Sequence, residues 1–410
     1  MRRGLTLAAI RHRVFLWRRA LGCERAFVVI FLGALALLAL TSSVTAPSRF
    51  ARSIYRADEL PALQATVVND VGQAPTLRFR ILQLTDMHYT GRQHYPCRNP
   101  PHKAVERHLP CTESRMTEFI RHLLDTVEPD FVVFSGDLIE SVEVPHTAAE
   151  VVDALHAATS EVVRRNLPWS MVFGNHDEGT TMSRRVMFGH LEDLPFGYIA
   201  MGPEGIGGVG NYALRVQAPQ DGPWNARKSI PSLLRLYFID SVKGLFTPSQ
   251  LEFVTELSAA TYHEHVPALM FFHHPLHEFK QYVDGDGQGQ RLEKVSHGDH
   301  NSGMFDALAQ MGDVKGVFVG HDHFNDYCFY NAPLHLCYGG GVGYGAAYGF
   351  EYTPRRARVI EWTWKTDAER ITTWLHEDLS MGGTVSDKYK VFERKHARQK
   401  LRAHDDMFLV

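Results

Sequence analysis

Asp, Asn and His side chains recur along the sequence in five short clusters whose residue types suit a metal site. The clusters are Asp-Met-His, Gly-Asp, Gly-Asn-His-Asp, His-His and Gly-His-Asp-His, and they begin at Asp86, Gly136, Gly174, His273 and Gly320. Carboxylate, carboxamide and imidazole ligands without a thiolate favour divalent metals such as Mn, Zn or Fe. Residues two apart in an extended segment share a face, so Asp86 and His88 could direct two ligands to one side. His321 and His323 repeat this spacing, and Asp137 between the two pairs is a carboxylate suited to bridging two metals about 3.5–4 Å apart.

Each cluster follows a short apolar segment that we predict to be a β-strand. These segments are Leu77–Leu84, Asp130–Ser135, Trp169–Phe173, Ala268–Phe272 and Val314–Val319, and Arg235–Ile239 has the same character. Amphipathic patterns predict helices over Ser114–Val127 and Ala148–Arg165. Strands that alternate with helices indicate an α/β layered fold. Because open α/β sheets place their sites at the carboxyl ends of strands, these strand ends predict one shared site.

The order of the five clusters resembles the calcineurin-like metallophosphoesterase superfamily. The segments LTDMHY, PDFVVFSGD, VFGNHD, FFHHPLHEF and GHDHFNDYC are most similar to phosphatases related to plant purple acid phosphatases and to fungal Dcr2-type phosphoesterases. The resemblance covers about residues 76–378. It implies a four-layer β-sandwich flanked by helices, with a dinuclear metal site along one edge.

The resemblance also assigns ligands to two divalent metal ions. One metal would take Asp86, His88, Asp137 and His323. The other would share Asp137 and take Asn175, His273 and His321. In the family the ligand histidine commonly stands two residues before a proline, which favours His273 over His274 because Pro275 follows.

The implied mechanism is hydrolysis of a phosphate ester. Two divalent metals would neutralise the ester and activate a bound water, and the metal-bound hydroxide would attack phosphorus in line. His176 would lie beside the scissile bond and either stabilise charge or protonate the leaving oxygen. Asp177 would orient His176 by accepting its other ring N–H. Phosphomonoesters are the favoured substrates. A phosphodiesterase on the same site is one alternative, and a catalytically silent, membrane-anchored binding protein is another.

One residue departs from the purple acid phosphatases. They carry a tyrosine three residues after the Gly-Asp aspartate, and its phenolate binds ferric iron. The corresponding residue here is Glu140. We therefore expect no purple chromophore, and the metal identity among Mn, Zn and Fe stays open.

The N-terminal segment predicts a membrane anchor. Residues 1–25 hold seven Arg and one Glu, and residues 26–44 form a nineteen-residue run without a charge. Such a run spans roughly the hydrocarbon thickness of a bilayer, and the basic flank predicts that residues 1–25 stay cytoplasmic. A retained signal anchor at 26–44 followed by a linker at 45–75 would place the catalytic domain in a lumen or outside the cell. The alternatives are a signal peptide cleaved near Ala46, which would release a secreted protein, and a buried core helix.

The cysteines agree with an exported domain. Beyond Cys23, the remaining four form two pairs that are close in sequence, Cys97 with Cys111 and Cys328 with Cys337. An even count after an export signal predicts two disulfides, and four unrelated thiols are the alternative.

The remaining features exclude more than they assign. A formal net charge of -3 gives no nucleic-acid footprint, and nothing fixes the oligomeric state or the physiological substrate. The Gly-x-Gly-x-x-Gly match at 205–210 precedes a strand-like run rather than a helix, so it predicts a loop. The glycine-rich segment 339–349 is either a loop lining the site or a plain turn. The segment 379–410 is a charged tail, and its run 388–404 is most simply a solvated helix.

Overall fold

The computed structural model describes residues 60–69, 72, 74–219 and 232–396. The predicted cytoplasmic segment 1–25, the anchor 26–44 and the last residues of the charged tail lie outside this part of the chain. Within the described ranges, no helix has both the length and the apolar character that crossing a bilayer requires.

One sheet carries the strands that lead into the first three clusters of Asp, Asn and His residues. Its strand order is β15-β14-β13-β3-β4-β5, and β2 pairs with β3. The strands are β2 (Thr66–Val68), β3 (Thr76–Leu84), β4 (Phe131–Ser135), β5 (Trp169–Val172), β13 (Arg356–Trp364), β14 (Ala368–Glu377) and β15 (Tyr389–Lys395). Strands β3, β4 and β5 run parallel, so their carboxyl ends meet at one edge. Every residue of β4 and β5 is buried, as expected for strands covered on both faces.

The second sheet carries the strands that lead into the other two clusters. Its order is β1-β6-β7-β8-β10-β12-β11-β9. The strands are β1 (Leu63–Gln64), β6 (Tyr212–Gln217), β7 (Leu234–Phe238), β8 (Ala268–Phe271), β9 (Gly287–Gln288), β10 (Val314–Val319), β11 (Cys328–Asn331) and β12 (Leu334–Tyr338). Strands β7, β8 and β10 are parallel neighbours, so their carboxyl ends also share an edge.

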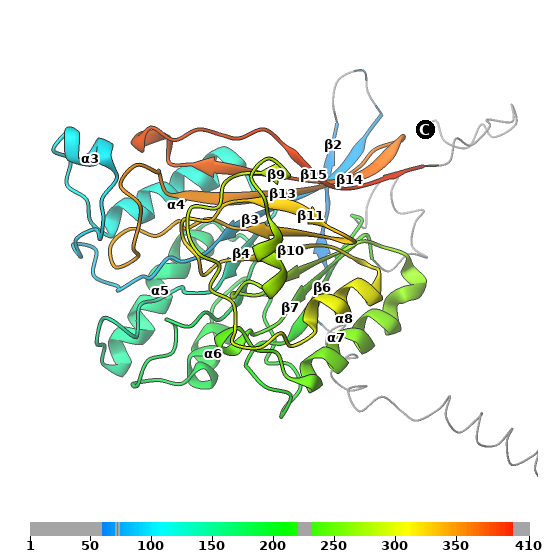
Figure 1. Ribbon diagram of the computed structural model, residues 1–410, viewed down its shortest axis with the longest axis horizontal. Helices are drawn as coiled ribbons and strands as arrows, with labels where there is room; N and C mark the ends of the chain where they lie inside the picture. The colour runs from blue at the N-terminus through cyan, green and yellow to red at the C-terminus, as the bar shows by residue number, and fades with distance from the viewer. Residues whose placement is uncertain (1–59, 70–71, 73, 220–231, 397–410) are drawn as a thin grey trace, which may run out of the picture. The chain divides into compact units, whose positions relative to one another are not determined.

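Helices pack on the sheets in two groups, with α4 and α5 in one and α7 and α8 in the other (Figure 1). The helices are α3 (His102–Glu106), α4 (Ser114–Val127), α5 (Ala148–Arg164), α6 (Arg184–Glu192), α7 (Pro248–Thr261) and α8 (Met304–Met311), with short 3-10 turns η2 (Val242–Gly244), η3 (Tyr262–Glu264), η4 (His277–Gln281) and η5 (Leu379–Met381). Helix α5 begins at a capping box in which Thr147 and Glu150 satisfy each other's backbone N–H groups. The two helices and the six strands that the sequence predicted are present, so these predictions and the α/β class are confirmed.

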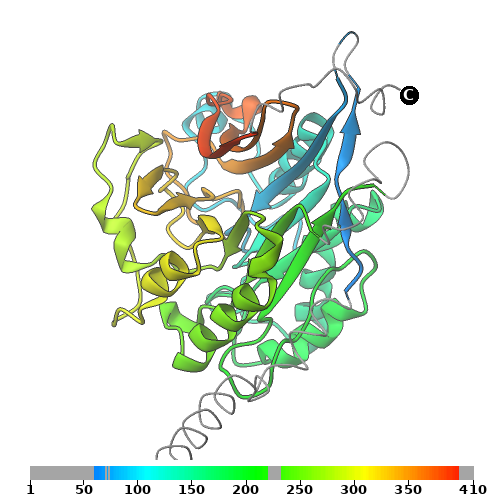
Figure 2. The same cartoon turned by 90° about the vertical axis from the view of Figure 1, so that its right-hand side faces the viewer.

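The two sheets share one apolar core. Buried side chains of both sheets belong to a single cluster. Polar contacts also join them, because the Tyr212 hydroxyl on β6 donates to the Met171 carbonyl on β5 at 2.6 Å. At the carboxyl edge the amide of Gln83 donates to the Val319 carbonyl at 3.1 Å. The carboxyl ends of both sets of parallel strands therefore lie at a common edge (Figure 2).

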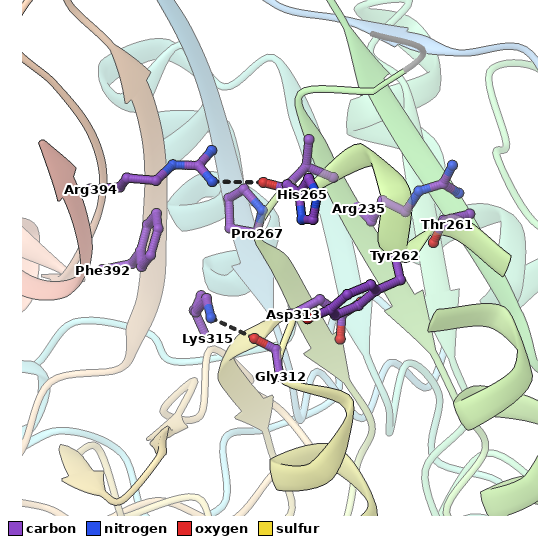
Figure 3. A pocket seen from close by; sticks show the side chains of 11 residues that line it. Arg235, Thr261, Tyr262, His265, Pro267, Gly312, Asp313, Lys315, Phe392 and Arg394 are labelled. Atoms are coloured by element: carbon purple, nitrogen blue, oxygen red, sulfur yellow. Dashed lines mark hydrogen bonds between the residues drawn. The ribbon is translucent and has the colours of Figure 1, made fainter. Parts of the chain in front are cut away.

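The amino ends of β8 and β10 border a different feature. A cavity of about 270 Å³ opens there, between the segment that precedes β8, the start of β10, and β15 (Figure 3). Arg235, Lys315 and Arg394 line it together with Asp313 and Tyr262.

The predicted charged helix at the C-terminus is wrong for its first part. Residues Tyr389–Lys395 form strand β15, which pairs antiparallel with β14. Ion pairs between neighbouring strands explain how so charged a segment joins a sheet, since Arg370 pairs with Glu393 at 2.7 Å and Arg394 with Glu369 at 2.6 Å. The sheet therefore extends beyond residue 378, and the predicted linker likewise contributes β1 and β2.

Three smaller predictions are confirmed. Both disulfides are present, Cys97–Cys111 and Cys328–Cys337. The second joins two residues that face each other in the β11–β12 pair. The glycine motif at 205–210 lies in a loop that leads into strand β6, as its sequence context indicated.

Candidate metal centre

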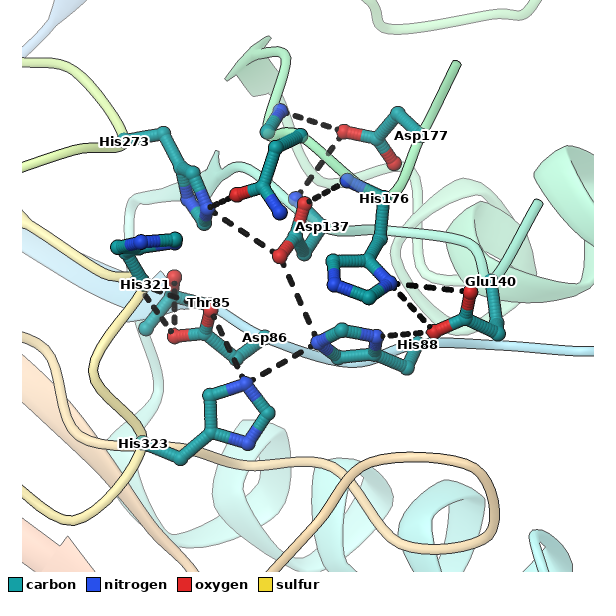
Figure 4. Close-up of polar contacts among 12 residues, drawn as sticks. Thr85, Asp86, His88, Asp137, Glu140, His176, Asp177, His273, His321 and His323 are labelled. Atoms are coloured by element: carbon teal, nitrogen blue, oxygen red, sulfur yellow. Dashed lines mark hydrogen bonds and ion pairs between the residues drawn. The ribbon is translucent and has the colours of Figure 1, made fainter. Parts of the chain in front are cut away.

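The structure brings the predicted ligands together at the common edge of the sheets (Figure 4). Asp86 and His88 follow β3, Asp137 follows β4, Asn175 follows β5, His273 follows β8, and His321 and His323 follow β10. Three groups of these residues offer ligand atoms that all lie within 4.8 Å of one another: Asp86 with His88 and His323, Asp137 with His273 and His321, and His88 with Asp137 and His176. The first group holds three of the four ligands predicted for one metal, and the second holds three of the four predicted for the other.

The backbone turns sharply at these positions. Asp86, His88 and Asp137 have φ values of 55°, 46° and 52°, in the left-handed region that side-chain-bearing residues seldom adopt. Such conformations cluster at functional sites, where the surrounding structure holds them. The neighbouring glycines leave no room for a side chain, because a Cβ on Gly136 would lie 2.3 Å from His273 Nδ1 and one on Gly174 would lie 2.1 Å from Asp137 Oδ1. These contacts explain why glycine precedes both Asp137 and Asn175.

Asp137 lies between the other side chains. Its Oδ2 atom is 3.5 Å from His88 Nε2 and 3.2 Å from His273 Nε2. The Asn175 Oδ1 atom lies 3.2 Å from the same nitrogen of His273. On the other side of the cluster, His88 Nε2 and His323 Nε2 are only 3.1 Å apart. Asp137 therefore joins the two groups through one carboxylate, the arrangement expected of a bridging ligand.

A hydrogen bond at Nδ1 orients each of three candidate ligand histidines. The Nδ1 atoms of His88, His273 and His323 lie 2.7, 2.9 and 2.9 Å from Glu140 Oε2, the Ser135 carbonyl and the Tyr348 carbonyl. In each ring Nδ1–H donates outward, and Nε2 is left facing the cluster. Metal-ligating histidines usually show this arrangement, which fixes both tautomer and ring orientation. The Tyr348 contact also shows that the glycine-rich segment 339–349 lies against the site.

Glu140 holds two histidines at once. Its side chain is 1% exposed, and it lies 2.7 Å from His88 Nδ1 and 2.9 Å from His176 Nδ1. Its Oε1 atom also accepts from the backbone N–H of Val142 and Glu143. In the sequence, Glu140 stands out only as the replacement of a tyrosine. The available signal was an acidic residue that directly follows the apolar Leu138 and Ile139 at a strand end, where a buried charge needs partners.

The predicted contact between Asp177 and His176 is wrong. Both Asp177 oxygens accept from backbone N–H groups, those of Asp137, Ile139 and Gly174, at 2.6 to 3.0 Å. Asp177 therefore shapes the loops that carry Asp137 and Asn175. The partner of the His176 ring is Glu140, because Glu140 approaches from the β4 loop on the same side as His88.

The two neighbouring histidines after β8 have different surroundings. His273 is fully buried and belongs to the group with Asp137 and His321. The His274 Nδ1 atom instead faces the Ser241 hydroxyl at 3.3 Å, outside the three groups. The geometry thus favours His273, as the following proline predicted.

Burial and neighbouring charges set the protonation of the cluster. Burial lowers the pKa of His321 to about 3 and holds the pKa of His323 well below its usual range, so both rings are neutral and can bind a metal. Burial also disfavours charge on Asp137 and His273, but their mutual attraction outweighs it, so the pKa of Asp137 falls and that of His273 rises to about 9. Metal binding at His273 would consequently release a proton.

The pair formed by His176 and Glu140 is ionic by the same reasoning. Burial lowers the pKa of His176, but the hydrogen bond to Glu140 and the negative charges of Asp137 and Glu140 together outweigh burial and raise that pKa to about 9. Burial raises the pKa of Glu140, but hydrogen bonds from His176 and His88 outweigh it and hold that pKa far below its usual range. His176 is 23% exposed, whereas His88 beside it is 3% exposed. The His176 ring therefore carries a proton and faces solvent.

The chain is similar to known proteins of one family. The family model for the calcineurin-like phosphoesterases matches residues 79–325. A probable inactive purple acid phosphatase 29 of Arabidopsis thaliana is 33% identical over 69% of this chain and 76% of its own length. The phosphatase DCR2 of Saccharomyces cerevisiae is 30% identical over 72% of this chain and 53% of its own length. Among solved structures, a dimetal phosphatase from Danio rerio covers 76% of this chain and 98% of its own at 12% identity with a TM-score of 0.46. The family model and the Arabidopsis relative show that the chain belongs to the calcineurin-like phosphoesterase family.

Proposed function

We propose that this protein hydrolyses phosphate esters, with phosphomonoesters favoured, at a site that holds two divalent metal ions. One ion would be held by Asp86, His88, Asp137 and His323. The other would be held by Asp137, Asn175, His273 and His321. When bound, two such ions supply the positive charge that neutralises a phosphate ester and activates water.

The observation that carries this proposal is the position of Asp137. One buried carboxylate lies 3.5 Å from His88 Nε2 and 3.2 Å from His273 Nε2, between two groups of nitrogen and oxygen donors. One-to-one pairing does not account for this set, because two Nε2 atoms converge on a single carboxylate oxygen. The converging oxygen and nitrogen donors would together bind two cations.

The residues outside the ligand sets have roles that follow from their contacts. His176 follows Asn175 in the chain, and its backbone N–H donates to Asp137 Oδ1 at 2.7 Å. Its Nδ1–H donates to Glu140, so Nε2–H is free to meet a substrate. A protonated ring in this position can give its proton to the leaving oxygen of the ester. Glu140 stabilises that protonated form and fixes the orientation of the ring.

An activity screen tests the function. The purified chain, loaded in turn with Mn, Zn and Fe, is assayed against a phosphomonoester, a phosphodiester and a phosphoprotein. We expect turnover of the monoester with about two metals per chain, and preferred turnover of the diester would favour the phosphodiesterase alternative. A chain that binds no metal under any of these conditions would contradict the proposal.

The competing function is a catalytically silent binding protein. It gains weight from the names of the Arabidopsis relatives, which are called probable inactive purple acid phosphatases. Against it, every predicted ligand position of this chain is filled and faces the cluster. Full metal loading without turnover of any ester would favour the silent protein.

We also propose that residues 26–44 anchor this domain, a four-layer β-sandwich, to a membrane with the site in a lumen or outside the cell. The uncharged run after seven arginines supports the anchor, and the two disulfides support an oxidising compartment. Protease protection in sealed vesicles tests this topology. Digestion of the domain from the cytosolic side would refute it, and release of a soluble domain would favour cleavage near Ala46.

A further inference from the structure

Aromatic side chains form a continuous strip from the metal centre to the surface. We define the aromatic strip as Tyr348, Phe324, Phe350 and Tyr352. The Tyr348 ring stacks on the candidate ligand His323 with a centroid distance of 3.6 Å and an interplanar angle of 8°. Phe324 follows at 5.2 Å from Tyr348, Phe350 at 5.5 Å from Phe324, and Tyr352 at 5.7 Å from Phe350.

The outer end of the strip is open to solvent. Phe350 is 44% exposed and Tyr352 is 70% exposed, whereas Tyr348 and Phe324 are only half-buried neighbours of the site. A single exposed aromatic residue is ordinary, but a run of them that begins on a candidate metal ligand is not. Exposed apolar patches at the rim of a site commonly mark the surface that binds a ligand.

The strip is held in place by the loops that carry it. The segment 339–349 passes so close to the site that a Cβ on Gly343 would lie 2.3 Å from the Asp86 carbonyl. Buried Arg355 donates to the Gly343 carbonyl at 2.6 Å and to the Arg98 carbonyl at 3.2 Å. The far end is also supported, because the His102 ring stacks on Tyr352 at 5.5 Å. A platform fixed in this way loses little conformational entropy when a ligand stacks on it.

We propose that the aromatic strip binds a planar ring system in the leaving group of the substrate, at the distance at which a nucleotide carries its base. This inference rests on the proposed phosphoesterase function and specifies the substrate class. One face of Tyr348 is covered by His323, so the first well-exposed ring is Phe350, two ring-to-ring steps further out. A ring bonded directly to the ester oxygen would stay near the metals. The ribose of a nucleotide sets the base several bonds further away, where Phe350 and Tyr352 can stack on it.

Two substrates with the same reacting bond test the proposal. Adenosine 5′-monophosphate and ribose 5-phosphate both release a primary alkoxide, and only the first carries a base. In the metal-loaded wild-type chain we expect kcat/KM to be roughly 5- to 100-fold higher for the nucleotide, the range of base stacking on aromatic side chains. The double substitution Phe350→Ala with Tyr352→Ala should bring this ratio toward one.

Further variants separate stacking from a loss of structure. Phe350→Leu keeps an apolar side chain without a π face and should also lower the ratio. Tyr330→Ala is the matched control, because Tyr330 is a 56% exposed tyrosine on β11 outside the strip, and the ratio should not change. Phenyl phosphate, whose ring is bonded to the ester oxygen, should respond to the strip substitutions no more than ribose 5-phosphate does.

The outcomes distinguish the strip from the function. A wild-type ratio near one, or a ratio that the strip substitutions leave unchanged, contradicts the proposed role of the aromatic strip. Either result leaves the proposed phosphoesterase function intact. If none of the esters is hydrolysed, the proposed function fails. In that case, the affinities of adenosine 5′-monophosphate and ribose 5-phosphate for the metal-loaded chain, measured by calorimetry, test the role of the strip by itself. Equal affinities contradict that role.

Discussion

The two ends of strands β8 and β10 hold clusters of charged residues that differ in how the charges are paired. At the amino ends, around the cavity of about 270 Å³, each cation has its own partner. Arg235 pairs with Glu264 at 2.7 Å, Arg394 with Glu369 at 2.6 Å, and Lys315 donates to the Gly312 carbonyl at 2.7 Å. At the carboxyl ends, His88 and His273 both face one oxygen of Asp137.

This difference separates a structural cluster from a candidate active site. At the amino-end cavity each arginine has a carboxylate partner and Lys315 has a carbonyl partner, so these cations are hydrogen-bonded within the chain. Shared pairing gathers nitrogen and oxygen donors of several residues around one carboxylate, which is the arrangement that binds an added metal cation.

The largest effect should follow replacement of the shared carboxylate. Asp137→Asn keeps the side-chain volume but removes the charge that both ligand groups share. We expect activity to be abolished and most of the metal to be lost, as measured by metal analysis of the purified chain. Asp313→Asn at the amino-end cavity is the matched control and should retain both metals. Full activity in the Asp137 variant would refute the bridging assignment.

Replacement of His176 should lower turnover without emptying the site. Because His176 lies outside the two ligand sets, His176→Ala should keep its metal and lose roughly 10²–10⁴-fold in kcat, the usual contribution of general acid–base catalysis. The loss should be smaller for esters with good leaving groups, which need little protonation. His273→Ala should instead lower the metal content, and His274→Ala should have a milder effect. Loss of metal in the His176 variant would contradict this division of roles.

Replacement of Glu140 should give an intermediate effect. Glu140→Gln keeps the shape of the side chain but weakens its hold on both His88 and His176. We expect a loss of roughly 10- to 100-fold in metal affinity or activity, the range for residues that orient metal ligands. If Glu140 acts through His176, kcat should fall more for alkyl esters than for nitrophenyl esters. An equal loss for both esters would contradict a role through His176 and would leave the contact with His88 as the route by which Glu140 acts.

The sequence predicted the centre of this site better than its surroundings. Each ligand follows a short apolar strand, so local pattern and sheet geometry together place Asp86, Asp137 and His273 at one edge. The role of Glu140 was hidden, because its partners come from loops after two other strands. The charged strand β15 was equally hidden, since its partners lie on β14 and not in its own segment.

The smallest effect should follow a change in the amino-end cavity. Lys315 is half-buried, burial lowers its pKa, and its ammonium group lies 5.5 Å from the centre of the Phe392 ring. Lys315→Met keeps most of the apolar side chain and removes one hydrogen bond, to the Gly312 carbonyl. We expect the free energy of unfolding to change by about 1 kcal/mol or less, the net value of one such bond. Metal content and kcat/KM should match the wild type within about twofold, because no shared charge is disturbed. A tenfold loss of turnover with intact metal would show that the cavity is coupled to the metal centre across the strands. The way in which charges are paired would then not distinguish the functional end of the strands from the structural end.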